Sequence, residues 1–516
     1  MRSALGSLAT DVDAAIADAL ALIPRLTARD HTVWQQDPTE VADRLGWLDA
    51  PQRAARDLDH LREVAAGLVA DGITDVVLTG MGGSSLYPEV LATTFGAAPD
   101  HPRLHVLDST DPGAVLALER QVPWSATVVV AASKSGTTVE TRSHLARFRA
   151  RLRDTHGDAA PRYLIAITDP GSDLDAEAVD AGFRAVVHGQ PDVGGRFSAL
   201  TPFGLLPAAI LGLDLEAHLA PAAELLEAVS STDPDRNTPV VLGAVLAAAA
   251  RRGRDKLTLL LPDEVAAFGG WVEQLVAEST GKHGMGIVPV LDEDAATLVD
   301  RLGDDRLVVA LGDRKHSDGL AAAGAPVVQL PWDGPGQLGA EVVRWEVATA
   351  IAGALLGLNP FDQPDVQSAK AATSAVLAAA GGGDVSLPET GEAAEVLGAV
   401  EPGGYLGLLA FVTPGGEDED RVRAAAQRLA TRLKVPVTVG TGPRYLHSTG
   451  QLHKGGPNAA GFLVVVGDDP EDAEVPGATY SFSQLKRAQA AGDIQALRAA
   501  GRRVARLSPA QVRDLS

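Results

Sequence analysis

TVVVAASKSGTTVET, residues 127–141, predicts a buried strand that runs directly into a helix. Its small and β-branched apolar residues at 128–132 are typical of a strand that is covered on both faces. The SKSGTT loop that follows places hydroxyl groups, Lys134 and Gly136 at the start of a helix, where unpaired N–H groups and the helix dipole favour anions. The pattern indicates a site for a sugar phosphate or a similar phosphate monoester. The alternative is an ordinary turn in which serine and threonine cap the helix.

A second loop of the same kind, GMGGSS at 80–85, follows another apolar segment at 73–79. One such loop is weak evidence, because glycine often serves only to make a tight turn. Further strands are expected at 104–107, 127–132, 163–167 and 185–187, with helical segments between them. This alternation predicts a parallel, doubly wound sheet with ligands at the carboxyl ends of the strands, and both loops lie at such ends.

The composition narrows the class of protein. A chain of 516 residues is long enough for two or three domains. The net charge of −23 argues against a general nucleic-acid-binding protein, and no apolar run reaches the roughly 20 residues that cross a bilayer. The N-terminal residues are acidic and amphipathic, unlike a signal sequence. The absence of cysteine excludes disulfides, thiolate metal sites and cysteine nucleophiles, so we expect a cytoplasmic protein.

Two charged side chains stand in segments where they could act on a ligand. Arg196, in VGGRFS at 193–198, follows two glycines that would let the backbone aim its guanidinium; the alternative is a surface arginine after a turn. Glu278, in AESTGK at 277–282, is expected near the end of a helix, where a carboxylate can project into a cleft and act as a general base. The alternative is a routine helix-end glutamate beside Lys282.

The second half of the chain repeats the alternation. Strands are expected at 257–261, 287–290, 307–311, 327–330, 405–412, 435–439 and 462–466, and helices at 338–356, 421–434 and 482–500. NPFDQPDVQSAK at 359–370 places Gln363 at the mouth of a helix and Lys370 about two turns along it. YLHSTGQLHKGG at 445–456 holds two histidines whose spacing does not match a helical metal site. We expect no metal there and one histidine that acts as an acid or base; a helix-cap or surface histidine is the alternative.

Six motifs between residues 80 and 456 together resemble the glucose-6-phosphate isomerase (phosphoglucose isomerase) family, in the form also found fused to transaldolase. They are GMGGSS, SKSGTTVET, GGRFS, AESTGK, NPFDQPDVQSAK and YLHSTGQLHKGG. The resemblance implies an α/β fold with two sugar-isomerase (SIS) domains, each with a parallel five-stranded sheet flanked by helices, plus a C-terminal α/β segment that completes the active site. The expected divisions are an N-terminal helical segment (1–70), a first, phosphate-binding SIS domain (71–220), a second SIS domain (238–370), a linker or insertion (371–404) and the C-terminal segment with the histidine motif (405–516).

The resemblance also implies an activity, which is the reversible isomerisation of D-glucose 6-phosphate and D-fructose 6-phosphate through a cis-enediol(ate). This step serves glycolysis and gluconeogenesis and needs no metal or other cofactor. Glu278 would move the proton between C2 and C1, Arg196 would stabilise the enediol(ate) oxygen, and His447 and Lys370 would assist ring opening. The residues that would bind the substrate are Gly83, Ser84, Ser133, Lys134, Ser135, Thr138, Thr141 and Gln363.

The order of the motifs departs from the usual isomerase. There the histidine segment precedes the FDQP segment, whereas here 446–451 follows 361–370, so the C-terminal segment is expected to supply His447 in cis or in trans. A homodimer is an expected assembly; no nucleic acid or membrane is an expected partner. The alternatives are an SIS isomerase that also accepts mannose 6-phosphate, a non-catalytic sensor of a sugar phosphate, and a degenerate structural paralogue. Retention of the four ionisable residues assigned above favours an enzyme over the last two.

Overall fold

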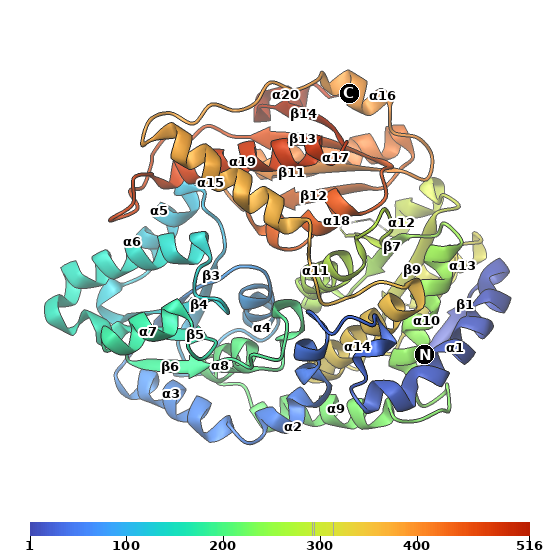
Figure 1. Ribbon diagram of the computed structural model, residues 1–516, viewed down its shortest axis with the longest axis horizontal. Helices are drawn as coiled ribbons and strands as arrows, with labels where there is room; N and C mark the ends of the chain where they lie inside the picture. Colours follow the sequence, from blue (N-terminus) through green and yellow to red (C-terminus); the bar gives the residue numbers. More distant parts are fainter. Residues whose placement is uncertain (292, 294, 313, 516) are drawn as a thin grey trace.

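Three α/β units lie around a common centre in the computed structural model, which describes residues 1–291, 293, 295–312 and 314–515 (Figure 1). Each unit is built on one sheet, and we call them the first, second and third unit in chain order. The predicted fold class is confirmed, with two five-stranded sheets and a further C-terminal α/β part. No helix among the described residues is long and apolar enough to cross a membrane.

The first unit carries a parallel sheet in the order β3-β2-β4-β5-β6. Its strands are β2 (Asp75–Thr79), β3 (Arg103–Leu107), β4 (Thr127–Ala132), β5 (Leu164–Thr168) and β6 (Ala185–His188). Its helices are α3 (Leu58–Ala70), α4 (Leu86–Phe95), α5 (Pro112–Gln121), α6 (Val139–His156), α7 (Asp173–Asp180) and α8 (Pro202–Ile210). Every residue of β4 is buried, as the run of apolar residues predicted.

The second unit carries a sheet in the order β1-β10-β9-β7-β8. Its strands are β1 (Arg2–Ala4), β7 (Lys256–Leu260), β8 (Val288–Val290), β9 (Arg306–Leu311) and β10 (Val327–Leu330). Its helices are α1 (Ala9–Thr27), α2 (Ala50–Ala54), α9 (Leu215–Ala228), α10 (Thr238–Arg251), α11 (Phe268–Thr280), α12 (Ala295–Leu298), α13 (Arg314–Ala322) and α14 (Leu338–Leu356). Four strands are parallel, and β1 pairs antiparallel with β10. The segment expected to be helical, 1–70, thus also supplies an edge strand, whose three exposed residues give no apolar pattern.

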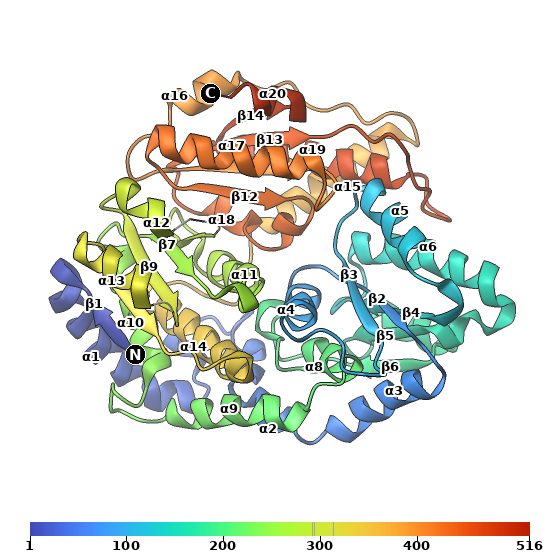
Figure 2. The same ribbon diagram turned by 180° about the vertical axis from the view of Figure 1, so that it is seen from behind.

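The third unit carries a parallel sheet in the order β12-β11-β13-β14. Its strands are β11 (Tyr405–Phe411), β12 (Val437–Thr441), β13 (Ala460–Val466) and β14 (Arg503–Leu507). Its helices are α15 (Val366–Ala380), α16 (Ala393–Gly398), α17 (Glu417–Leu433), α18 (Gly450–Gly455), α19 (Phe482–Ala499) and α20 (Pro509–Arg513). Helices α15 and α19 lie side by side on one face of the sheet, and α17 covers the other (Figures 1 and 2). The expected linker at 371–404 therefore begins inside a packed helix; the division into domains stays a prediction.

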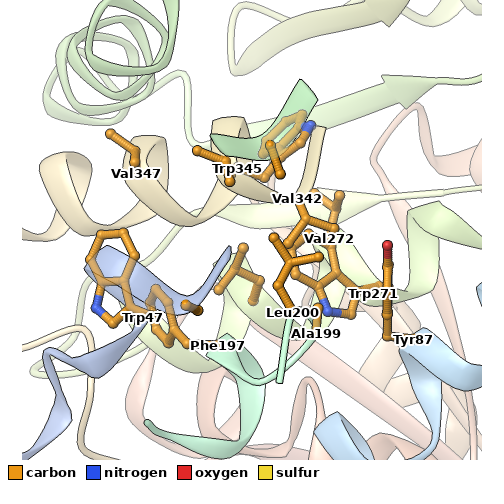
Figure 3. Packing of buried hydrophobic residues seen from close by; sticks show 14 of the residues in the cluster. Trp47, Tyr87, Phe197, Ala199, Leu200, Trp271, Val272, Val342, Trp345 and Val347 are labelled. Atoms are coloured by element: carbon orange, nitrogen blue, oxygen red, sulfur yellow. The ribbon is translucent and has the colours of Figure 1, made fainter. Parts of the chain in front are cut away.

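An aromatic cluster joins the segments that hold the site. The ring centroid of Phe197 lies 5.2 Å from that of Trp47 and 5.2 Å from that of Phe361, which in turn lies 4.9 Å from Trp34. Figure 3 shows Trp47 and Phe197 together below helix α14, whose residues from 338 to 353 are buried. Because Phe197 follows Arg196 in the chain and Phe361 belongs to the FDQP motif, this packing fixes both loops at once.

Glu346 of α14 is a fully buried carboxyl group in the same core. Its Oε1 has no hydrogen-bond partner among the described residues, and burial raises the pKa of Glu346 well above its ordinary value. The folded protein therefore keeps on Glu346 a proton that the unfolded chain releases. The free energy of unfolding falls as the pH rises above the pKa that Glu346 has in the unfolded chain. We expect Glu346→Gln to unfold at the wild-type temperature at pH 5 and at a higher temperature at pH 8. The wild type should therefore lose stability relative to Glu346→Gln as the pH rises over this window.

Thermal unfolding at a fixed scan rate across that pH range would check this expectation. The control is Glu224→Gln, at an exposed position on α9. Equal midpoints for wild type and Glu346→Gln at pH 8 would show that the carboxyl group ionises without cost.

Candidate active site

The GMGGSS loop at 80–85, which follows β2, packs against the GGRFS segment at 194–198, which follows β6. Gly82 has a φ of +55°, and a Cβ atom there would lie 2.7 Å from the Gln274 amide nitrogen. A Cβ atom on Gly83 would lie 1.9 Å from the carbonyl oxygen of Gly195, in the GGRFS motif. The loop therefore needs glycine because neighbouring backbone and side chains come too close for any side chain. Ser84, beside it, is half-buried.

Gly83→Ala is expected to destabilise the protein, because the methyl group must displace a backbone carbonyl in a packed region. Overpacking of this kind costs about 1–3 kcal/mol, and here it also moves the loop that carries Arg196. The matched control is Gly195→Ala on the facing loop, since a Cβ atom there meets nothing within 4 Å. Thermal unfolding and steady-state activity of the two variants would check the expectation. Equal behaviour of the pair would contradict it.

The SKSGTT loop after β4 forms a compact cluster of hydroxyl groups at the start of α6. The Ser133 and Thr138 hydroxyl oxygens are 3.1 Å apart, and the Ser133 hydroxyl accepts a hydrogen bond from Gly136 N–H (3.1 Å). Ser135 is exposed, and the buried Thr141 hydroxyl has no hydrogen-bond partner among the described residues. Hydroxyl groups near a helix N-terminus are suited to binding an anion.

Lys134 lies in the same loop, but its ammonium group contacts other partners. It forms an ion pair with Asp169 and donates to the main-chain carbonyls of Gln190 and Pro191, each at 3.2 Å. These contacts hold together the loops that follow β5 and β6. The predicted role of Lys134 at the phosphate stays a prediction.

Arg196 is the most densely bonded side chain of the site, and it is only 4% exposed. Its guanidinium donates to Ser279 Oγ (2.9 Å), Gln363 Oε1 (2.9 Å) and the carbonyls of Pro360 (2.7 Å) and Asp362 (2.8 Å), and it lies 3.1 Å from Glu278 Oε1. These acceptors come from α11 and from the FDQP loop. The arginine of the first unit is therefore fixed in place by hydrogen bonds to the second unit and to the loop that follows it. The alternative of a surface arginine is wrong.

Glu278 lies near the end of α11 and is 12% exposed. Besides Arg196, its carboxylate accepts a hydrogen bond from Gln274 (3.2 Å), one turn earlier on the same helix. The Gln274 amide also donates to the carbonyl oxygen of His447 (2.8 Å). Glu278 is therefore held by Arg196 and Gln274, and it is connected to the histidine segment through the Gln274 side chain.

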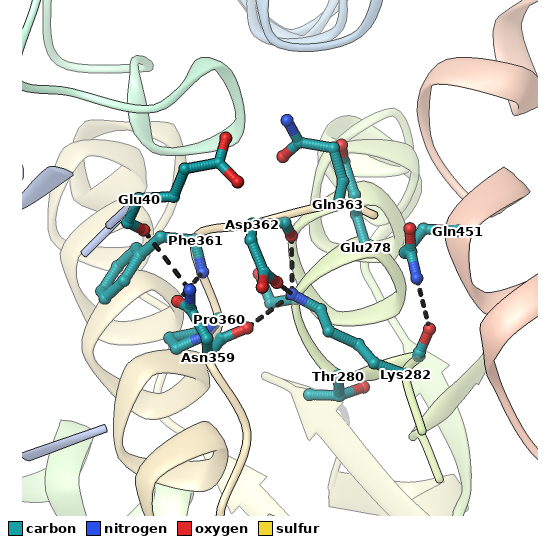
Figure 4. A network of polar contacts seen from close by, with 12 residues as sticks. Glu40, Glu278, Thr280, Lys282, Asn359, Pro360, Phe361, Asp362, Gln363 and Gln451 are labelled. Carbon is teal, nitrogen blue, oxygen red and sulfur yellow. Dashed lines mark hydrogen bonds and ion pairs between the residues drawn. The ribbon is translucent and has the colours of Figure 1, made fainter. Parts of the chain in front are cut away.

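The buried Lys282 supports the FDQP loop, to which Arg196 also bonds (Figure 4). The Lys282 ammonium group donates to the carbonyl oxygen of Asp362 (2.6 Å) and also contacts the Asp362 carboxylate and the Asn359 carbonyl. Burial, together with the charge of Arg196, lowers the pKa of Lys282 to about 8. Figure 4 shows Glu278 and Gln363 above this network, so Lys282 braces the loop that presents Gln363.

His447 comes from the third unit of the same chain and reaches the first. Its Nε2 donates to Glu140 Oε1 (2.9 Å), at the start of α6 directly after the SKSGTT loop. Burial opposes ionisation of Glu140, but the charge and hydrogen bond of His447, with the charge of Lys370, hold its pKa below the ordinary value. Lys370 lies on α15 and is exposed. The structure thus places both residues near one buried carboxylate.

Gln451 of the LHSTGQ motif ties the third unit to the second. Its amide nitrogen donates to the Gly281 carbonyl oxygen (3.0 Å) and to Asp365 Oδ2 (2.6 Å), and its oxygen accepts from Asp365 N–H (2.9 Å). Sequence reasoning did not single out Gln451, although it stands within a quoted motif. It also missed Glu140, in the same TVET segment as Thr141, because a carboxylate at a helix start resembles an ordinary capping residue.

A cavity of about 1120 Å³ opens where the three units meet, but it is not this site. Tyr445 and Ser448 line it, whereas Arg196, Glu278 and His447 do not. The cavity therefore lies beside the histidine segment, away from the side chains described above. The Arg196–Glu278 pair and the His447–Glu140 pair are instead linked to each other through Gln274.

The arrangement offers three chemical capabilities in one place. A carboxylate beside a fixed guanidinium can move a proton while the cation stabilises an adjacent oxyanion. A histidine paired with a carboxylate can act as an acid or base near neutral pH. A hydroxyl-lined loop at a helix N-terminus can bind a phosphate group.

Comparisons with known proteins agree with this chemistry. The family model for phosphoglucose isomerase matches residues 54–294. Glucose-6-phosphate isomerase of Rubrobacter xylanophilus is 31% identical over 406 residues, which are 68% of this chain and 92% of the relative. That of Thermus thermophilus is 32% identical over 388 residues, which are 66% of this chain and 91% of the relative.

Solved structures show the same fold. A hypothetical protein from Thermus thermophilus aligns with a TM-score of 0.62 and 28% identity over 73% of this chain and 99% of its own. A glucose-6-phosphate isomerase from Chlamydia trachomatis aligns with a TM-score of 0.61 over 71% of this chain and 86% of its own; at 19% identity it shows the fold alone. The sequence identity and the coverage of the relatives together establish that the chain belongs to the glucose-6-phosphate isomerase family.

Proposed function

We propose that this chain interconverts D-glucose 6-phosphate and D-fructose 6-phosphate by moving a proton between C2 and C1. The observation that carries the proposal is the Arg196–Glu278 pair, 3.1 Å apart, in a site that also holds His447 and the SKSGTT loop. Family membership supports the same reaction. A sensor that only binds a sugar phosphate would need the loops but not the pair.

Glu278 acts as the base. It removes the proton from C2 of the open-chain aldose and returns it to C1 of the resulting cis-enediol(ate), so one carboxylate serves both half-reactions. Arg196 stabilises the oxygen on which negative charge develops, because its guanidinium is fixed by several acceptors before the substrate arrives. An arginine suits this role because it keeps its proton and does not quench the intermediate.

His447 and Lys370 assist ring opening. One supplies a proton to the ring oxygen while the other assists proton removal from O1, and Glu140 holds the His447 ring in place. The phosphate group is held by the loops that contain Gly83, Ser84, Ser133, Ser135, Thr138 and Thr141, with Lys134 beside them. Gln363, which accepts from Arg196, positions the sugar.

The remaining expectations are part of the same proposal. The chain corresponds to the isomerase form that is also found fused to transaldolase. His447 acts in cis, because its partner Glu140 belongs to the same chain. A homodimer and a cytoplasmic location stay predictions.

A coupled assay tests the proposal. Purified protein is supplied with fructose 6-phosphate, EDTA and glucose-6-phosphate dehydrogenase with NADP as the reporter. We expect NADPH formation that depends on the protein and persists in EDTA. Binding of the sugar phosphate without turnover would support the sensor instead, and absence of both would support a structural paralogue.

A further inference from the structure

Helix α19 of the third unit carries a row of buried polar side chains that bond to the first unit and to the histidine segment. Lys486, Gln489 and Asp493 follow one another at intervals of three and four residues, so they lie on the same face of the helix. Each is at most 2% exposed. A buried polar row is costly unless every member is bonded, and each of these side chains bonds to a segment beyond α19.

Gln489 bonds to the same carboxylate oxygen as the proposed catalytic histidine. Its amide nitrogen donates to Glu140 Oε1 (2.7 Å), which also accepts from His447 Nε2 (2.9 Å). The orientation of the amide is fixed from its other side, because the Thr110 hydroxyl donates to Gln489 Oε1 (2.6 Å). Thr110, Gln489, Glu140 and His447 thus form a continuous chain of hydrogen bonds.

The next turn of α19 fixes the histidine segment. Asp493 accepts a hydrogen bond from the Tyr445 hydroxyl (2.7 Å) and forms an ion pair with Lys454 (2.6 Å). Tyr445 stands two residues before His447 and Lys454 seven residues after it. The same helix therefore holds both members of the His447–Glu140 pair.

We infer that Gln489 is a positioning residue for the proposed isomerisation, which orients the Glu140 carboxylate toward His447 from a helix outside both SIS sheets. This inference rests on the proposed function. A hydrogen bond donated to a carboxylate favours its ionised form, so Gln489 supports the charge that Glu140 presents to His447. The ionisable groups that act on Glu140 are His447 and Lys370, with His144 one turn further along α6.

The test compares Gln489→Met, which removes the donor at nearly equal length, with Gln489→Glu. The control is Gln495→Met, at an exposed position of the same helix. Gln489→Met removes the hydrogen bond to the charged Glu140 carboxylate, which is expected to lower kcat on the order of 10–100-fold with little change in KM. Because Glu140 loses a donor that favours its charge, the loss in Gln489→Met should grow as the pH falls from 8 to 5.

Gln489→Glu should show the opposite trend. While one proton is shared between residue 489 and Glu140, the hydrogen bond persists and activity stays near wild type. As the pH rises and both carboxylates ionise, they repel each other and activity falls. A residue that only packs against its neighbours would give losses independent of pH in both variants. Superimposable profiles of wild type and Gln489→Met, or equal losses at every pH, would overturn the inference.

A second readout does not depend on turnover. The NMR titration curve of the His447 ring, assigned by comparison with His447→Gln, should change in Gln489→Met and match the wild type in Gln495→Met. An inactive wild type would refute the proposed isomerisation, whereas this titration would still test the contact between Gln489, Glu140 and His447. An unchanged titration in a folded Gln489→Met would overturn the inference.

Discussion

Glu278→Gln is expected to lower kcat by about 10³-fold, within the range of roughly 10²–10⁴ that a general base contributes. The amide is nearly identical in shape and can still accept from Arg196 and Gln274, so substrate binding should change little. What it lacks is the ability to take a proton from C2. The measurement is steady-state kinetics with fructose 6-phosphate, in which kcat should fall while KM stays within a few-fold of the wild type.

Two further variants make this expectation specific. Glu278→Asp keeps the charge but withdraws the carboxylate by about one C–C bond, so it should retain more activity than the amide. Glu273→Gln, on the same helix but lining the cavity beside the site, should leave kcat near the wild-type value. Activity of Glu278→Gln within about tenfold of the wild type would mean that another group is the base.

Arg196→Met is expected to lower kcat on the order of 10²–10³-fold, because loss of a donor to a developing oxyanion has that effect. The charge it stabilises appears in the transition state, so KM should change much less than kcat. Arg196→Met should also unfold at lower temperature, because it removes the donor that bonds to the buried Pro360 carbonyl and to the Ser279 hydroxyl.

Arg196→Lys separates charge from geometry. A lysine keeps the positive charge but cannot reach the fork of acceptors that the guanidinium spans, so it should rescue stability only in part and kcat little. Arg44→Met is the control, since the Arg44 side chain lies near Gly194 of the same loop while its guanidinium bonds to Asp43. A full rescue of kcat by lysine would show that a simple positive charge suffices.

Local patterns predicted the parts of the fold that local chemistry determines. The apolar run at 128–132 is a buried strand, and the glycine and hydroxyl loops lie at strand ends as expected. Strand β1 could not be predicted in this way, because three exposed residues that pair with β10 carry no periodic signal. Strand β14 was missed for a related reason, since two of its five residues, Arg503 and Arg506, are exposed arginines that interrupt the apolar pattern.

The partners of the site residues were beyond reach of sequence patterns. Glu140 meets His447 across 307 positions and Gln489 across 349, so only the folded chain brings them together. Sequence patterns also could not tell which of the two histidines of the third unit, His447 or His453, belongs to the core. His453 is buried with its ring centroid 5.0 Å from that of Phe462, and burial lowers its pKa well below the ordinary value, which marks it as a core residue. Spacing alone could not separate it from His447.

The most direct test of the account is to convert fructose 6-phosphate to glucose 6-phosphate in D₂O and to observe C2 of the product by NMR. A base that carries the proton between C1 and C2 exchanges part of it with solvent, so part of the product should carry deuterium at C2. In Glu278→Gln, conversion and incorporation should both slow by about 10³-fold. Product that retains all of the substrate hydrogen at C2, or undiminished incorporation in Glu278→Gln, would contradict proton transfer by Glu278.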